Sequence, residues 1–511
     1  LYTIRLATQG LANYLNKQPL EKRRVFIGYD VRSNSDAFAL EAARVLAGNQ
    51  IDALLTDDIC PTPLVSFGCR HVQCQAAIMI TASHNPPEYN GYKVYWQDGG
   101  QIVAPHDQGI IEEVRKIQNP SQVLIASENS PLIQRIDSSL DEAYLTELAS
   151  HRLYEALPSI NIIYTPLHGT GIRILPNALK TWGFSCALVD QQKTPDGQFP
   201  HAKTPNPEEP KALELGAQML VEQQADLLLG TDPDADRVGA AVLHERAPVF
   251  LTGNQIACLC LDHLCQALLK KNALSADSAC IKTIVTTELF KKIAESYKAS
   301  CFDVLTGFKY IAAEIEKWER SKAPHHYLFG GEESFGYLFG TFVRDKDAIS
   351  SSCLIAEAAA LAKQNKMTLV DKLYELYARY GVHRESLTNI SLPDNQEGLN
   401  KIQSLMDSLR TNPPTQINGQ PLIQIDDYLS SQSKHLPTNT ITPISLPSSN
   451  VLRFWLQDNS KLVIRPSGTE PKMKIYAEVS EKNPDINKTV QSCDARLYDL
   501  VQHFQNLHLA N

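Results

Sequence analysis

Short aliphatic runs that end at polar loops recur through the first half of the chain and constrain its fold most strongly. Residues 76–80, 160–164 and 226–229 are such runs, and each precedes a serine, threonine or aspartate loop. A short apolar run bounded by loop residues is typical of a buried strand. Patterns typical of helices lie between strand-like runs, as at residues 36–47, and Gly48 is expected to end that helix. This alternation predicts largely parallel sheets joined by crossover helices.

The chain length predicts several domains, because 511 residues exceed what one hydrophobic core supports. The patterns place domains at residues 1–148, 149–249, 250–390 and 391–511. The first three are expected to be mixed α/β domains and the last a smaller α+β domain, with strands at 451–456, 462–464 and 474–479 and a helix over 486–508. Further helices are expected over 2–15 and 172–182. Residues 392–449, rich in Pro, Ser, Asn and Gln, are expected to form a linker or an irregular lead-in.

The composition is that of a globular protein, with 43% hydrophobic and 21% charged residues. No apolar run reaches the roughly 18 residues of a membrane span, and the net charge of −9 argues against nucleic-acid or membrane binding. The 11 cysteines are scattered without a CxxC pair. We therefore expect reduced core cysteines in a cytoplasmic protein, with no cysteine metal site. No signal-peptide pattern is present.

A serine follows the apolar run at residues 76–80. The stretch from Thr81 to Lys93 reads Thr-Ala-Ser-His-Asn-Pro-Pro-Glu-Tyr-Asn-Gly-Tyr-Lys. Ser83 would stand at the mouth of the sheet, where α/β folds place their ligands, and the two prolines would keep the loop rigid. A serine that only caps a turn is the alternative for the Ser-His pair alone.

Three aspartates, Asp232, Asp234 and Asp236, alternate in the loop after the run at residues 226–229. Crowded carboxylates repel one another and raise their own pKa values, so a divalent cation is the natural counter-charge. An EF-hand loop would need glycine and glutamate where Arg237 and Leu243 stand. The pattern therefore predicts a magnesium or calcium site of another kind, with a solvated acidic turn as the alternative.

Four motifs resemble those of the α-D-phosphohexomutases, the phosphoglucomutase/phosphomannomutase family, in the family's order. They are the Thr81–Lys93 run, Asp-Pro-Asp-Ala-Asp-Arg at 232–237, Gly-Glu-Glu-Ser-Phe-Gly at 331–336 and Arg-Pro-Ser-Gly-Thr-Glu-Pro-Lys at 465–472. The resemblance implies three consecutive mixed α/β domains around a central cleft plus a smaller C-terminal α+β domain. It also implies that Ser83 is carried as a phosphoserine and that one of its oxygens joins the three aspartates around Mg²⁺.

The resemblance assigns further site residues by motif. It implies catalytic roles for His84, Lys93 and Lys309, the last in Thr-Gly-Phe-Lys at 306–309, although either lysine alone could be a solvated surface side chain. It implies sugar binding by Arg237, Glu332 and Ser334, for which turn acids are the alternative. The family's loop for the non-transferred phosphate corresponds to Arg465, Ser467, Gly468 and Thr469, residue types suited to binding phosphate.

The predicted activity is exchange between the 1-phosphate and 6-phosphate of a hexose through a bisphosphorylated sugar. Glucose ranks first, pentose second and mannose third, because the opening residues 2–12, the Gly-Glu-Glu-Ser-Phe-Gly loop and the run 344–347 resemble the phosphoglucomutase-2-like and phosphopentomutase branch. Glucose 1,6-bisphosphate is the expected activator, sugar phosphates are the expected partners, and the expected state is monomer or homodimer.

Two other classes stay open. A phosphatase of the haloacid-dehalogenase type would use an aspartate nucleophile, but Arg237 replaces its usual β-branched residue and Ser83 would have no role. A non-catalytic sugar-phosphate-binding protein would keep Ser83 unphosphorylated. The helix over 2–15 resembles the one after the family's N-terminal Gly-rich loop, so an upstream segment with that loop is expected.

Overall fold

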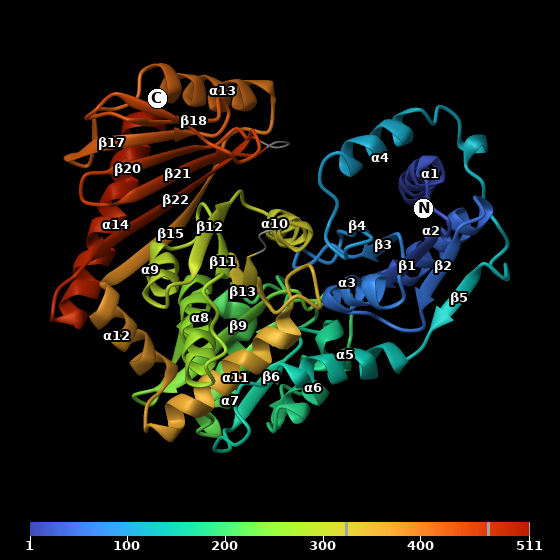
Figure 1. Cartoon of the computed structure of the whole chain (residues 1–511), viewed down its shortest axis with the longest axis horizontal. Coiled ribbons are helices and arrows are strands. Elements are labelled where there is room, and N and C mark those ends of the chain that lie inside the picture. The colour runs from blue at the N-terminus through green and yellow to red at the C-terminus, as the bar shows by residue number, and fades with distance from the viewer. Residues whose placement is uncertain (322–324, 468–470, 510–511) are drawn as a thin grey trace. The chain divides into compact units, whose positions relative to one another are not determined.

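A computed structural model describes residues 1–321, 325–467 and 471–509, and the chain divides into two compact units (Figure 1). The first unit comprises Leu1–Lys282, Ala294–Phe302 and Gly307–Lys372. The second comprises Thr283–Ile293, Asp303–Thr306 and Leu373–Asn511.

The first sheet is formed by the N-terminal part of the first unit. Its strands are β1 (Arg24–Tyr29), β2 (Asp52–Thr56), β3 (Ala76–Ile80), β4 (Tyr92–Trp96) and β5 (Ile133–Ile136). They lie in the order β4-β3-β1-β2-β5, and the β3–β4 pair alone is antiparallel. Its helices are α1 (Tyr2–Lys17), α2 (Ser35–Gly48), α3 (Thr62–His71), α4 (His106–Arg115) and α5 (Ser139–Ser150).

Helices cover both faces of this sheet. Val25 and Ile27 of β1 join the core formed with α1 and α2, whereas Phe26, which points to the other face, packs against Gly68 of α3. A strand covered on both faces can be apolar throughout, and every residue of β3 is buried. The apolar run at 76–80 is therefore a central strand, as its composition predicted.

The second sheet is also mixed. Its strands are β6 (Ile162–Thr165), β7 (Cys186–Leu188), β8 (Leu227–Thr231), β9 (Val238–His244) and β10 (Ala247–Leu251), in the order β10-β9-β8-β6-β7. The neighbours of β6 are parallel to it, while β8–β9 and β9–β10 are antiparallel. Its helices are α6 (Leu175–Thr181) and α7 (Glu214–Glu222), and α7 packs on β6, β8, β9 and β10.

The third sheet has four strands, β11 (Ser278–Thr283), β12 (Ser300–Val304), β13 (His326–Gly331) and β14 (Tyr337–Phe339), in the order β12-β11-β13-β14. The helices of this region are α8 (Gly253–Lys270), α9 (Glu288–Ser296), α10 (Phe308–Arg320), α11 (Ala348–Gln364) and α12 (Leu369–Tyr380). Helix α11 contacts β8 and β9 of the second sheet as well as β14, so the second and third sheets share a helical layer.

The second unit is built on an antiparallel sheet. Its strands are β15 (Val382–Ser391), β16 (Gln416–Ile417), β17 (Gln420–Asp427), β18 (Gln432–His435), β19 (Thr440–Pro443), β20 (Leu452–Leu456), β21 (Lys461–Pro466) and β22 (Lys472–Glu481). The order is β15-β22-β21-β20-β17-β18-β19, with β16 paired to β17. Helix α14 (Ile486–Leu509) packs on β15 and β22, and α13 (Gln396–Thr411) also belongs to this unit. The predicted fold class is thus confirmed, whereas the four domain boundaries stay a prediction.

Two local predictions were wrong. Residues 392–449 are not a linker, because they contain α13 and the interior strand β17; Asn395 caps α13, and Ile402, Met406 and Leu409 are buried along it. The polar composition there reflects half-exposed elements. The helix predicted over 172–182 is also interrupted: a 3₁₀ turn spans Thr170–Arg173 and α6 begins only at Leu175, because Pro176 favours the first turn of a helix.

Candidate active site

Ser83 is the third residue after the end of β3, in a fixed backbone conformation. Its φ is +51°, a left-handed value that residues with a side chain adopt uncommonly. The Ser83 N–H donates to Thr81 Oγ1 at 2.8 Å, and Ser83 Oγ donates to Asp232 Oδ2 at 2.8 Å. The serine hydroxyl is therefore directed at the aspartate loop that follows β8.

The aspartate loop turns tightly between β8 and β9. The carbonyl of Asp232 accepts from the N–H of Ala235, while its Oδ1 accepts from the N–H groups of Asp236 and Arg237, each at 3.0 Å. The Oγ1 hydroxyl of Thr62, at the start of α3, donates a hydrogen bond to Asp234 Oδ2 at 2.7 Å. One oxygen of each aspartate lies within 4.8 Å of the others, and all three side chains are buried.

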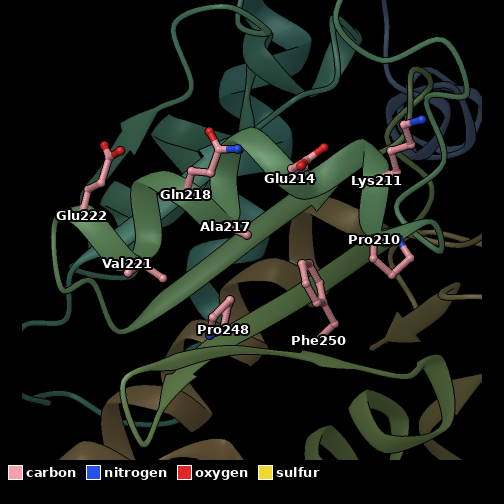
Figure 2. Close-up of a pocket in the computed structure, with 9 residues that line it drawn as sticks. All are labelled: Pro210, Lys211, Glu214, Ala217, Gln218, Val221, Glu222, Pro248 and Phe250. Carbon is pink, nitrogen blue, oxygen red and sulfur yellow. The ribbon is translucent and has the colours of Figure 1, made fainter.

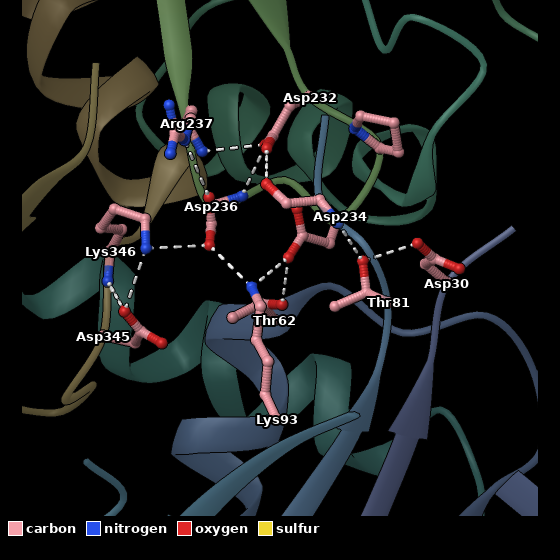
Figure 3. Close-up of polar contacts among 12 residues, drawn as sticks. Asp30, Thr62, Thr81, Lys93, Asp232, Asp234, Asp236, Arg237, Asp345 and Lys346 are labelled. Atoms are coloured by element: carbon pink, nitrogen blue, oxygen red, sulfur yellow. Dashed lines mark hydrogen bonds and ion pairs between the residues drawn. The ribbon is translucent and has the colours of Figure 1, made fainter. Parts of the chain in front are cut away.

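Two lysines face the three carboxylates (Figure 3). Lys93 of β4 forms ion pairs with Asp234 at 2.8 Å and Asp236 at 3.2 Å. Lys346, which precedes α11, forms an ion pair with Asp236 at 3.0 Å. The charged groups of the cluster therefore come from β4 of the first sheet, from the loop after β8 of the second sheet, and from the segment before α11.

The electrostatics differ from one aspartate to the next. Burial, together with repulsion from Asp234 and Asp236, raises the pKa of Asp232 well above its usual range. Burial also acts to raise the pKa of Asp234, but Lys93 outweighs it and lowers that pKa. For Lys93, burial acts to lower the pKa, but Asp234 and Asp236 raise it well above the ordinary value. The Lys93 amine is therefore protonated at neutral pH.

The residues present fit a divalent cation. Three buried carboxylates on one loop supply hard oxygen ligands of the type that Mg²⁺ prefers. Asp234 Oδ1 is buried without a hydrogen-bond partner among the described residues, and burial, together with repulsion from Asp234 and Asp236, raises the pKa of Asp232. The loop could therefore hold a metal ion.

His84 lies beside the serine as a neutral imidazole. Burial first, and then the nearby Arg237, lower its pKa to about 3. His84 Nδ1 is 3.1 Å from Ser83 Oγ. Because the hydroxyl hydrogen is directed to Asp232, the neutral ring must carry its proton on Nδ1 to donate to Ser83 Oγ.

The predicted sugar-binding residues lie on loops that are bonded to one another. The carbonyl of Phe335, the residue after Ser334, accepts a hydrogen bond from the N–H of Val238 at 3.0 Å. Val238 is the residue after Arg237. Glu332 is buried and its Oε1 accepts from the N–H of Gly307 at 2.9 Å.

Burial raises the pKa of Glu332, while Lys346 acts to lower it. Arg237 forms an ion pair with Glu208 at 2.5 Å. Lys309 follows Gly307 in the first turn of α10, where its Nζ lies 5.2 Å from the centre of the Tyr310 ring.

The predicted phosphate-binding residues belong to the second unit. Arg465 lies near the end of β21 and Ser467 follows that strand, with the Ser467 N–H donating to the carbonyl of Lys472 at 2.7 Å. Gly468 and Thr469 lie outside the described residues. Their role in binding phosphate stays a prediction.

Sequence reasoning missed several residues of the cluster. Asp30 and Arg32 follow β1 and contact the serine loop, Thr62 holds Asp234, and Lys346 holds Asp236. The strand-end rule that singled out Ser83 would also have found Asp30 and Arg32, because they follow the neighbouring parallel strand. No sequence signal would have joined Thr62 or Lys346 to a loop more than one hundred residues away.

A groove of about 800 Å³ lies away from these residues, between α7 and the edge strand β10 (Figure 2). It contains none of the predicted site residues. Its lining is Pro210, Lys211, Glu214, Ala217, Gln218, Val221, Glu222, Pro248 and Phe250.

Three family models match the chain in order, and they define its class. Each is described as a phosphoglucomutase/phosphomannomutase alpha/beta/alpha domain: domain I at residues 1–121, domain II at 142–245 and domain III at 252–380. The chain belongs to the phosphoglucomutase/phosphomannomutase family.

Curated relatives and solved structures agree with this assignment. A phosphoglucomutase of Staphylococcus aureus strain N315 is 37% identical over 501 residues, which cover 97% of this chain and 89% of the relative. A phosphoglucomutase/phosphomannomutase family protein from Burkholderia thailandensis has a TM-score of 0.70 at 16% identity, covering 99% of this chain and 92% of its own. The open form of parafusin, a Paramecium phosphoprotein, has a TM-score of 0.67 at 17% identity, covering 98% and 92%. These two structures share the fold.

Among the helices of the described residues, none combines the length and apolar character needed to cross a membrane.

Proposed function

We propose that this chain is a phosphohexose mutase that exchanges the 1-phosphate and 6-phosphate of a hexose, with glucose phosphate as the preferred substrate. The observation that carries the proposal is the 2.8 Å hydrogen bond from Ser83 Oγ to Asp232. It joins a strand-end serine to a loop suited to a divalent cation. Family membership and the phosphoglucomutase relatives favour this function over a phosphatase or a non-catalytic binding protein.

The reaction begins with Ser83 as a phosphoserine. The bond between phosphorus and Ser83 Oγ breaks as a bond forms between phosphorus and a hydroxyl oxygen of the sugar monophosphate. A side-chain base takes the proton of that hydroxyl, and Ser83 Oγ leaves and takes up a proton. The resulting sugar bisphosphate reorients, and the same steps in reverse return its other phosphoryl group to Ser83.

The charges on the described residues limit which of them can move protons. Lys93 is held as a cation by Asp234 and Asp236, so it suits charge stabilisation or proton donation rather than proton removal. Neutral His84 can donate a hydrogen bond from Nδ1 to the leaving Ser83 Oγ, while the proton that Oγ takes up comes from another group. Lys309 is the remaining candidate for the base among the predicted catalytic residues.

Asp232, Asp234 and Asp236, with a phosphoserine oxygen, would hold Mg²⁺. The ion would supply electrostatic neutralisation of the phosphoryl oxygens. Around it, Arg237 and Lys346 add positive charge, and the main-chain N–H groups that bind Asp232 keep that carboxylate in one orientation.

Sugar recognition falls to Glu332 and Ser334, which can hydrogen-bond neighbouring hydroxyl groups. Arg465, Ser467, Gly468 and Thr469 would bind the phosphate that is not transferred. Binding energy from this remote group would hold the bisphosphate through its reorientation and keep water from the phosphoserine. Location in the cytoplasm and a monomeric or homodimeric state stay predictions from the sequence.

The test is turnover of glucose 1-phosphate, ribose 1-phosphate and mannose 1-phosphate with Mg²⁺ and a trace of the matching bisphosphate. Wild type is compared with Ser83→Ala and with Ser138→Ala, which alters an exposed serine. We expect turnover, fastest with glucose 1-phosphate, in wild type and Ser138→Ala, and none in Ser83→Ala.

Intact-mass and peptide analysis after acid treatment should find a phosphoserine at position 83. An acid-labile phosphate on an aspartate would support the phosphatase class instead. Sugar-phosphate binding without turnover or phosphoserine would identify a binding protein. Faster turnover of the pentose or mannose phosphate would overturn the choice of glucose.

A further inference from the structure

The guanidinium group of Arg32 lies buried beneath the Ser83 loop and binds its backbone. Nη2 donates to the carbonyl oxygens of Ser83 and Asn85, each at 2.5 Å, and Nη1 donates to those of Pro86 at 2.8 Å and Tyr89 at 3.0 Å. The Arg32 side chain is 0% exposed. Four carbonyl groups of one loop therefore converge on a single buried cation.

Asp30 connects Arg32 to the amide side of the same loop. Its carboxylate forms an ion pair with Arg32 Nε at 3.2 Å and accepts from Thr81 Oγ1 at 2.6 Å. Thr81 Oγ1 in turn accepts from the N–H of Ser83. The peptide groups on both sides of Ser83 are thus held by one network, which begins at Arg32 and Asp30.

This network determines the direction of the serine side chain. With φ at +51°, Ser83 turns its carbonyl toward Arg32 while its Oγ points to Asp232. A residue with a side chain is strained in this region, so the loop needs an external partner to keep it there. Releasing the Ser83 carbonyl would let the residue relax and move Oγ away from Asp232.

A second segment, which contains Gly197 and Phe199, also packs against Arg32 and its neighbours. The Phe199 ring centre lies 5.1 Å from the guanidinium carbon, and Phe199 is fully buried. At Gly197, an added Cβ would come within 2.6 Å of the Val31 carbonyl oxygen, so this segment can approach only with glycine there. Phe199 precedes β8 and the aspartate loop in the chain, so Arg32 contacts both the serine loop and the segment that leads to Asp232.

We propose that Arg32 is a positioning residue for phosphoryl transfer, which fixes the distance and direction of Ser83 Oγ relative to Asp232. The inference rests on the proposed mutase function. Arg32 is not a catalytic residue, because it is buried under the loop and, among the described residues, bonds neither to the Ser83 hydroxyl nor to Asp232, Asp234 or Asp236. Its planar group serves several carbonyls in fixed directions, which a lysine ammonium on a flexible stem cannot reproduce.

The test compares Arg32→Met, Arg32→Lys and Phe199→Leu with a matched control, Arg173→Met. Arg173 is also a largely buried arginine, paired with Asp141 and the Ile59 carbonyl, but it makes no contact with the serine loop among the described residues. For each protein, kcat and KM are measured per folded molecule, and amide hydrogen exchange is followed for residues 83–91.

We expect Arg32→Met to lower kcat by ~100-fold, the scale of a misplacement of about 1 Å, with KM nearly unchanged and faster exchange in the loop. Arg32→Lys should recover part of kcat, and Phe199→Leu should give a smaller loss of the same kind. Arg173→Met should lower stability but leave kcat and loop exchange unaltered.

Unchanged kcat and loop exchange in Arg32→Lys and Phe199→Leu would overturn the proposal, even if Arg32→Met does not fold. So would an equal loss of kcat in Arg173→Met, which would make the effect one of general stability. Absence of phosphoserine in wild type would instead refute the proposed function, while the exchange data would still report on the loop.

Discussion

Lys93 in the first unit and Lys461 in the second each lie between two carboxylates at similar distances. Lys93 Nζ is 2.8 Å from Asp234 and 3.2 Å from Asp236. Lys461 Nζ is 2.8 Å from Glu288 and 2.9 Å from Glu478. Their surroundings differ, however: the Lys93 side chain is 21% exposed and that of Lys461 only 2%.

The two clusters also differ in where their carboxylates come from. Around Lys93, three buried aspartates are crowded on one loop. Burial and the other two aspartates together raise the pKa of Asp232. Around Lys461, Glu288 and Glu478 come from separate elements.

Glu478 Oε1 accepts from His383 Nδ1 at 2.8 Å and from the Glu288 N–H at 2.8 Å. The first cluster places three carboxylates on one tight loop, whereas the second joins carboxylates from separate elements through one lysine. The crowding of carboxylates on one loop therefore distinguishes a candidate binding site from a structural network.

The strongest test of this contrast is Asp232→Asn. Removing a metal ligand should lower kcat/KM by ~1000-fold, equivalent to about 4 kcal/mol. The same change should raise the unfolding midpoint in EDTA, because burial and the neighbouring aspartates disfavour the charged Asp232 in the folded state. Thermal unfolding with and without Mg²⁺ measures this, and Asp190→Asn, at an exposed aspartate, is the control. Lower stability of Asp232→Asn in EDTA would contradict the account.

Glu478→Gln should have the opposite profile. Because it leaves Lys461 buried with one fewer carboxylate partner, we expect a loss of about 3 kcal/mol in the free energy of unfolding of the second unit. Turnover per folded molecule should be unchanged. Urea denaturation followed by circular dichroism measures the loss, and Glu397→Gln, at an exposed glutamate, provides the comparison. A fall in kcat with normal stability would assign Glu478 to function.

The stabilisation that Glu478 provides should depend on pH. Burial acts to raise the pKa of Glu478, but Lys461 and His383 outweigh it and lower the pKa from 4.5 to about 2. A carboxylate with a lowered pKa in the folded state stabilises the fold above its unfolded pKa, and this contribution is lost as the pH falls through the folded value.

The stability difference between wild type and Glu478→Gln should therefore be constant above pH 4.5 and shrink between 4.5 and about 2. Urea titrations over this range decide the matter. A difference that stays constant to the lowest pH would show that charge is not its source.

The pattern of residues determined much of the first unit. The run at 76–80 is a fully buried central strand because its residues are apolar on both faces. The alternating aspartates predicted a carboxylate cluster, and the structure brings Ser83 to it. Short-range signals were enough to place each loop at the end of its strand. The contact between them was not predictable in this way, because Ser83 follows β3 of the first sheet and the aspartates follow β8 of the second.

Longer-range partners depended on the tertiary structure. The polar composition of residues 392–449 led to the wrong prediction of a linker or an irregular lead-in. The segment forms a helix and strands that are half exposed, and such elements tolerate many polar side chains. The ion pair between Lys461 and Glu478 was not predictable for another reason. It depends on the register of β21 and β22, and the number of residues between the lysine and the glutamate does not fix that register.

Local patterns of residues were enough to find the strand-end loops, the aspartate spacing and the family motifs. Folding was needed to reveal that Arg32 binds four carbonyl groups of the serine loop, that Thr62 donates to Asp234, and that Lys346 pairs with Asp236. The physical reason is that hydrogen bonds and ion pairs act over a few ångströms in space, while these partners lie tens to hundreds of residues apart along the chain.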